Sequence, residues 1–171
     1  MSDFPAITHV AVTVTDLGRS RAWYQGLFGT EPVLDEDTGP FHHVVWLLGG
    51  TLFEIHRHAG VQSGEPFDER HSGLDHVAFA CANRAELESW QDHLNSLGIH
   101  NGGIVDAHHG SGLSFRDPDN IALEFLLPRL DTTALADRPT ADHVGRNCQR
   151  SRRIAGTLSV PRNTPLQGGN Q

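Results

Sequence analysis

The first part of the chain alternates between two kinds of hydrophobic pattern. Short stretches of β-branched and aromatic residues bounded by Gly, Pro or Asp predict strands. One longer stretch carries apolar residues at helical spacing and stops at Gly29, which predicts a helix. The pattern predicts a strand, a helix and three more strands, at 6–14, 16–28, 31–36, 41–48 and 51–58. This order is β-α-β-β-β.

The same order returns after a polar connector at 59–73. The last two strands of the second copy flank Asp117-Pro118-Asp119-Asn120, whose residue types are typical of a turn. The elements of the second copy are predicted at 74–81, 84–97, 99–105, 111–116 and 121–127. We therefore expect an α+β fold of two tandem βαβββ modules, spanning about 6–58 and 74–128 within a domain at 1–130.

Each copy carries one histidine and one glutamate at corresponding places. His9 lies in Thr8-His9-Val10-Ala11 and His76 in Asp75-His76-Val77-Ala78. Glu54 and Glu124 lie in the last strand of each module. Two imidazoles and two carboxylates brought together would make a metal site.

The faces of these strands support that interpretation, because side chains alternate across a strand. In each strand the His or Glu lies opposite a row of bulky apolar residues, and small residues such as Ala11 and Ala78 share its face. A polar side chain among alanines is what a cavity wall requires. His56 shares the face of Glu54 and is the alternative ligand at that point.

Composition narrows the function classes. The chain has 171 residues and a net charge of −8, and all 13 of its basic residues are arginines. The absence of lysine excludes Schiff-base chemistry and a lysine-type phosphate loop. The acidic charge lies in 1–130, which argues against nucleic-acid binding.

The cellular setting follows from equally simple features. No apolar run approaches the roughly 18 residues of a membrane span, and the first residues show no signal-peptide pattern. With two cysteines, Cys81 and Cys148, a disulfide framework is not expected, which favours a cytoplasmic protein. Residues 131–171 lose all periodicity and gain Arg, Pro and Gly, so we expect a disordered basic tail.

The doubled unit, the paired His-Val-Ala strands and the Asp-Pro-Asp-Asn turn before Leu123-Glu124-Phe125 resemble the vicinal oxygen chelate superfamily. This superfamily includes glyoxalase I, extradiol dioxygenases and bleomycin- and fosfomycin-resistance proteins. The resemblance covers about 6–128. It implies two cup-shaped modules that enclose a divalent metal ion (Zn, Ni, Co, Mn or Fe(II)), with the ligands His9, Glu54, His76 and Glu124.

The resemblance implies a metal-dependent lyase or isomerase of the glyoxalase type. It would act on a small carbonyl compound through a metal-stabilised enediolate, with Glu54 and Glu124 as catalytic proton carriers. One alternative is an extradiol-type Fe(II) dioxygenase using two histidines and one glutamate. Another is a bleomycin-resistance-like binding protein for a cationic ligand. A fosfomycin-type enzyme needs several cationic groups, and Arg116 is the one candidate near the cavity strands.

The resemblance also bears on assembly. In this superfamily the two cups close within one chain or across a dimer. We expect a homodimer that binds a small-molecule substrate, without a nucleic-acid or membrane partner. If the site spans two chains, His9 comes from one subunit and His76 from the other.

Overall fold

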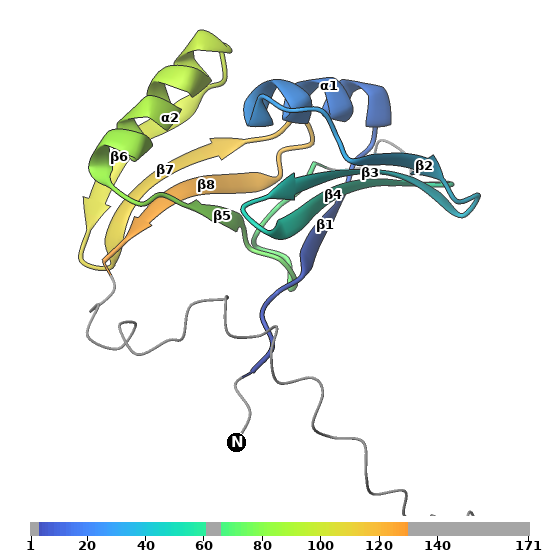
Figure 1. Cartoon of the computed structure of the whole chain (residues 1–171), viewed down its shortest axis with the longest axis horizontal. Coiled ribbons are helices and arrows are strands. Elements are labelled where there is room, and N and C mark those ends of the chain that lie inside the picture. Colours follow the sequence, from blue (N-terminus) through green and yellow to red (C-terminus); the bar gives the residue numbers. More distant parts are fainter. Residues whose placement is uncertain (1–3, 61–65, 130–171) are drawn as a thin grey trace, which may run out of the picture. The chain divides into compact units, whose positions relative to one another are not determined.

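The computed structural model describes residues 4–60 and 66–129 and contains both modules. The four strands of the first module form one mixed sheet in the order β1-β4-β3-β2, in which β1 is parallel to β4 (Figure 1). Its elements are β1 (His9–Thr13), α1 (Leu17–Phe28), β2 (Leu34–Asp37), β3 (Phe41–Leu48) and β4 (Thr51–His58).

The second module repeats this topology. Its sheet has the order β5-β8-β7-β6, again with the first and last strands parallel. Its elements are β5 (Val77–Ala80), α2 (Arg84–Ser96), β6 (Asn101–Ala107), β7 (Gly110–Arg116) and β8 (Ala122–Pro128). The predicted α+β fold of two βαβββ modules is confirmed. The predicted tail at 131–171 lies outside the described residues.

The helices begin and end where the sequence supplies caps. The Asp16 carboxylate accepts a hydrogen bond from the backbone N–H of Arg19, and Gly29 ends α1 with a left-handed φ of 65°. Asn83 caps α2 in the same way by accepting from Glu86 N–H. No helix within 4–60 and 66–129 is long and apolar enough to cross a membrane.

Each helix covers one face of its own sheet (Figure 1). The covered faces carry the buried row that the sequence predicts, including Val12, Ile55 and Phe125. In α1 the fully buried aromatic side chain is Tyr24, whereas Trp23 packs at the border of the core. The opposite face of β1 and β5 is exposed, and His9 lies on it in β1. His76 lies immediately before β5, and Glu54 and Glu124 are half-buried on β4 and β8.

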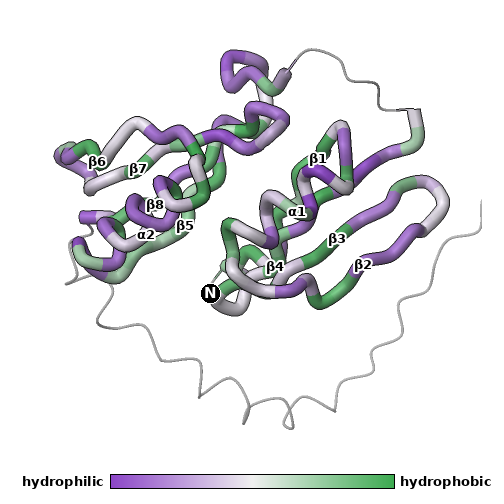
Figure 2. Tube along the Cα trace, turned by 90° about the horizontal axis from the view of Figure 1, so that it is seen from above, coloured by the Kyte–Doolittle hydropathy of each residue, from purple (hydrophilic) through white to green (hydrophobic). Residues whose placement is uncertain are grey.

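The outermost strand of the first sheet is short and acidic. Figure 2 shows β2 as a largely hydrophilic stretch, and every residue of Leu34–Asp37 is exposed. Three consecutive carboxylates on an edge strand discourage pairing with another chain. The sequence predicts this strand at 31–36, whereas regular pairing begins three residues later, at Leu34. One hydrogen bond precedes it, from Val33 N–H to Val45 O.

The turn Asp117–Asn120 between β7 and β8 joins the two modules. Tyr24 on α1 donates its hydroxyl hydrogen to Asp117 Oδ2 at 3.0 Å. The backbone N–H of Thr15 bonds Asp119 Oδ2 at 3.0 Å, and Arg19 Nη2 lies 2.6 Å from Asp119 Oδ1. The turn therefore reverses the chain and also holds α1 of the first module through hydrogen bonds and an ion pair.

Candidate metal centre

The predicted ligands occupy equivalent register positions in the two sheets. Ala11 faces Glu54 across β1 and β4, and Ala78 faces Glu124 across β5 and β8. Each histidine lies two residues before that alanine, so it is on the same face of the sheet as the glutamate of its own module. The residues that correspond in the sequence repeat therefore occupy corresponding positions in the two modules. Each module contributes one imidazole and one carboxylate, which we call a half-site.

In the second module the two groups of the half-site are close together. His76 Nε2 lies 3.6 Å from Glu124 Oε2. Two ligands on one metal ion with bonds of about 2.0–2.2 Å lie about 3–3.5 Å apart, so this spacing suits a shared ion. The other ring nitrogen of His76, Nδ1, lies 2.6 Å from Asp75 Oδ1. A carboxylate in that position orients a metal-binding imidazole.

In the first module the carboxylate is surrounded by imidazoles. Burial raises the pKa of Glu54, but the hydrogen bond from His56, the neighbouring His43 and the charge of His9 outweigh it, so the pKa is lowered. Glu54 is therefore a carboxylate at neutral pH, the form that binds a cation or accepts a proton.

His43, Glu54 and His56 form the tightest cluster of ligand atoms. Glu54 Oε2 lies 2.9 Å from His56 Nε2 and 3.6 Å from His43 Nδ1. The sequence predicts His56 as the alternative ligand to Glu54 and gives His43 no role. The signal that could have identified His43 is the register between β3 and β4, in which His43 is paired with His56. A hairpin with its turn at Gly49-Gly50 predicts that pairing.

Among the described residues, the ligands of the two half-sites do not form one cluster. Among residues 4–60 and 66–129, the His43, Glu54 and His56 cluster is the one set of three or more potential ligands whose atoms lie within 4.8 Å of one another. His9 and His76 are both exposed.

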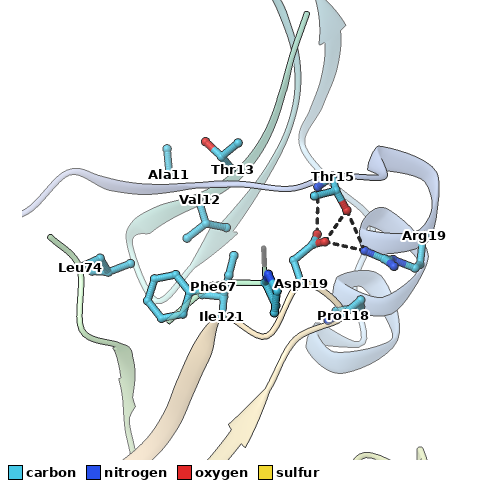
Figure 3. Close-up of a pocket in the computed structure, with 11 residues that line it drawn as sticks. Ala11, Val12, Thr13, Thr15, Arg19, Phe67, Leu74, Pro118, Asp119 and Ile121 are labelled. Atoms are coloured by element: carbon cyan, nitrogen blue, oxygen red, sulfur yellow. Dashed lines mark hydrogen bonds and ion pairs between the residues drawn. The ribbon is translucent and has the colours of Figure 1, made fainter. Parts of the chain in front are cut away.

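A pocket of about 570 Å³ runs from Ala11 on β1 to the turn Asp117–Asn120. Figure 3 shows that its polar end is closed by Asp119, whose carboxylate is bonded to Thr15 and Arg19. Phe67 and Ile121 lie along its apolar part (Figure 3). No predicted ligand lines this pocket, so it borders the first half-site without containing it.

Two other candidate groups have structural partners. Arg116 forms a double ion pair with Glu69, with nitrogen–oxygen distances of 2.7 and 2.8 Å, so its charge is already neutralised. Burial raises the pKa of the Cys81 thiol to about 11, which leaves it an unreactive part of the core.

Comparisons with known proteins agree with this architecture. The family model of the Glyoxalase/Bleomycin resistance protein/Dioxygenase superfamily matches residues 6–125. No curated protein matches the chain. A glyoxylase/bleomycin resistance protein/dioxygenase domain from Frankia sp. EAN1pec is 30% identical, with a TM-score of 0.68 over 74% of this chain and all of that domain.

Two further solved structures share the fold at lower identity. The fosfomycin resistance protein FosX from Listeria monocytogenes, in a complex with manganese(II) and a dihydroxypropylphosphonic acid, is 19% identical with a TM-score of 0.58, covering 77% of this chain and 99% of that one. Lactoylglutathione lyase from Agrobacterium tumefaciens is 22% identical with a TM-score of 0.57, covering 74% and 96%. The resemblance noted in the sequence is confirmed: the chain belongs to the Glyoxalase/Bleomycin resistance protein/Dioxygenase superfamily, also called the vicinal oxygen chelate superfamily.

Proposed function

We propose that this protein is a metal-dependent lyase or isomerase of its superfamily, acting on a small carbonyl compound. The metal ligands would be His9 and Glu54 from one half-site and His76 and Glu124 from the other. The observation that carries the proposal is the equivalence of the half-sites, each with its imidazole and carboxylate at corresponding positions of the sheet.

The donor set fits a divalent metal ion. Two imidazoles and two carboxylates suit Zn, Ni, Co, Mn or Fe(II), and four protein ligands leave one or two positions for substrate oxygens. The 3.6 Å separation in the pair of His76 and Glu124 supports this fit. When bound, such an ion polarises a carbonyl group of the substrate and so acidifies the adjacent C–H.

The chain's own residues would move the proton. Glu54 has a lowered pKa and is ionised at neutral pH, so it can accept a proton from carbon. Glu124 occupies the corresponding position in the other half-site and can return the proton on the opposite side. The small side chains Ala11 and Ala78 leave space above both strands for a substrate.

We propose a homodimer as the active form, because the half-sites do not converge within the described part of one chain. A symmetric dimer would join the first half-site of one subunit to the second half-site of its partner, twice. The exposed faces of β1 and β5 are free for that contact in a single chain.

Two reactions separate this proposal from its alternatives. Metal-loaded protein should convert the hemithioacetal of methylglyoxal and a thiol into a thioester, a reaction that is measured by ultraviolet absorbance. The same protein should not consume oxygen when it is given catechols. His76→Ala and Glu124→Gln should each lower kcat/KM by at least about a hundredfold if these residues act in the transition state. Oxygen uptake with catechols, and no thioester, would instead establish the dioxygenase alternative.

Fosfomycin-type chemistry is disfavoured by charge. A phosphonate needs several unpaired cationic groups around it, and the candidate arginine, Arg116, is held by Glu69. Arg19 is likewise paired with Asp119 at 2.6 Å. The similarity to the Listeria protein is therefore one of fold.

A further inference from the structure

We infer that the first module binds a divalent transition-metal ion by itself, through His43, Glu54 and His56. This site shares Glu54 with the proposed catalytic centre and goes beyond it, because it needs neither the second module nor a second chain. It consists of two histidines and one carboxylate on the adjacent strands β3 and β4. Such a set binds Zn, Co, Ni or Fe(II) and leaves further positions open.

The distances suit a shared ion. Glu54 Oε2 lies 2.9 Å from His56 Nε2 and 3.6 Å from His43 Nδ1, and all three ligand atoms lie within 4.8 Å of one another. These separations bracket the roughly 3–3.5 Å expected for ligands on one ion with bonds of about 2.0–2.2 Å. Little movement would therefore be needed on binding.

The ring nitrogens of His43 give the clearest support for this site. Both of its ring nitrogens are buried and neither has a hydrogen-bond partner among the described residues. A buried polar atom without a partner loses its hydration and gains no hydrogen bond in return, so such atoms are rare in folded proteins. A metal ion between His43 Nδ1 and Glu54 Oε2 would supply the partner that the described residues do not.

The surroundings of His43 resemble those of a metal-binding imidazole. Its second ring nitrogen, Nε2, lies 3.8 Å from Glu36 Oε2, close to where a carboxylate orients such a ring. The ring of Phe41 stacks on His56 with centroids 4.7 Å apart and meets the edge of His43 at 5.4 Å. This aromatic wall restrains both imidazoles beside Glu54.

The second module shows that the cluster is not a general property of the fold. Glu124 is equivalent to Glu54, and the positions equivalent to His43 and His56 are Gly112 and Leu126. Neither of those two residues can bind a metal. Two histidines therefore lie beside Glu54, and no histidines occupy the equivalent positions beside Glu124.

The two metal sites can be separated experimentally. The double variant His76→Ala/Glu124→Ala removes the second half-site of the proposed catalytic centre and leaves the cluster intact. In this background the full-length protein should still bind stoichiometric Co(II), measured by visible absorption and by metal analysis after gel filtration. Binding should not require activity or dimer formation.

Adding His43→Ala or His56→Ala to that background should weaken Co(II) binding by more than about a hundredfold, because even residues outside the ligand shell change metal affinity by about 10–100-fold. His42→Ala and His58→Ala are matched controls on the same two strands and should leave binding unchanged. His42 is paired with Asp35, and His58 follows His56 outside the cluster. His43→Gln provides a second, more conservative substitution, and circular dichroism of each metal-free variant verifies folding.

Three results would overturn the inference. The folded double variant could fail to bind Co(II), the variants at His43 and His56 could bind it as tightly as their parent, or the control variants could lose it equally. None of these results would refute the proposed catalytic centre, whose test is the loss of turnover on changing His76 or Glu124. Conversely, an inactive protein that keeps His43-dependent Co(II) would refute the catalytic proposal alone.

Discussion

At the scale of single residues, the two equivalent carboxylates differ in what lies next to them. Glu54 faces imidazoles, whereas Glu124 lies against Gly112 on the neighbouring strand. A Cβ atom at Gly112 would overlap with Oε1 of Glu124 and would lie 3.2 Å from its Cδ. The glycine therefore leaves the space in which the Glu124 carboxylate lies, 3.6 Å from His76.

Replacing this glycine tests the role of that space. Gly112→Ala should push the carboxylate of Glu124 away and weaken metal binding at the proposed catalytic centre by about tenfold or more, comparable to the loss of an orienting partner. The fold should remain, because the displaced atoms are the flexible end of a side chain. Titration with Zn(II) and thermal unfolding measure the two effects.

A control comes from the adjacent strand. Gly102 on β6 has open space around its Cα, with Ser114 O the nearest atom to an added Cβ at 4.0 Å. Gly102→Ala should leave metal binding unchanged. Equal metal affinity in the Gly112 and Gly102 variants would show that Glu124 does not depend on the glycine.

At the scale of elements, the turn between β7 and β8 acts as the joint between the modules. Asp119 receives hydrogen bonds from both the backbone and the hydroxyl of Thr15, and it pairs with Arg19 at 2.6 Å. Burial raises the pKa of Asp119, but these hydrogen bonds and the charge of Arg19 outweigh it, so the pKa is lowered. The ionised carboxylate therefore stabilises the folded state.

The lowered pKa fixes the direction of a pH dependence. The contribution of Asp119 should be complete above its unfolded pKa of about 3.9, and it should be lost as the pH falls through the lower folded-state pKa. Asp119→Asn should lower the free energy of unfolding by about 1–3 kcal/mol at pH 7, and less below about pH 4. Urea denaturation at a series of pH values measures this difference.

Asp92→Asn, at an exposed position on α2, serves as the control and should change little at any pH. A difference between wild type and Asp119→Asn that stays constant from neutral to acidic pH would contradict an ionised Asp119 in the joint.

The order of the elements could be predicted from sequence because it rests on local signals. Alternating strands, helical spacing and the caps Asp16, Gly29 and Asn83 each act within a few residues. The second role of the Asp117–Asn120 turn was not predictable. Its partners on α1 lie about a hundred residues earlier in the chain, and no local pattern records such a contact.

Sequence could predict only those residues of the candidate site that occur in both copies of the repeat. His9, Glu54, His76 and Glu124 are related by the internal repeat, which is why they could be found without a structure. His43 has no counterpart, because its equivalent is Gly112, so the repeat gives no reason to select it. Only the pairing of β3 with β4 places it beside Glu54.

At the scale of the whole molecule, the central claim is that the catalytic centre joins half-sites from two chains. Two inactive variants can test it together. His9→Ala/Glu54→Ala removes the first half-site, and His76→Ala/Glu124→Ala removes the second. A heterodimer of the two would carry one intact site, built from the unaltered module of each chain.

Co-expression of the two variants, followed by an assay of hemithioacetal turnover, is the most direct test. Each variant alone should be inactive. The mixture should regain about a quarter of wild-type activity, because random pairing makes about half of the dimers mixed and each mixed dimer has one intact site of two. A mixture as inactive as its components, with heterodimers present, would contradict a centre shared between chains.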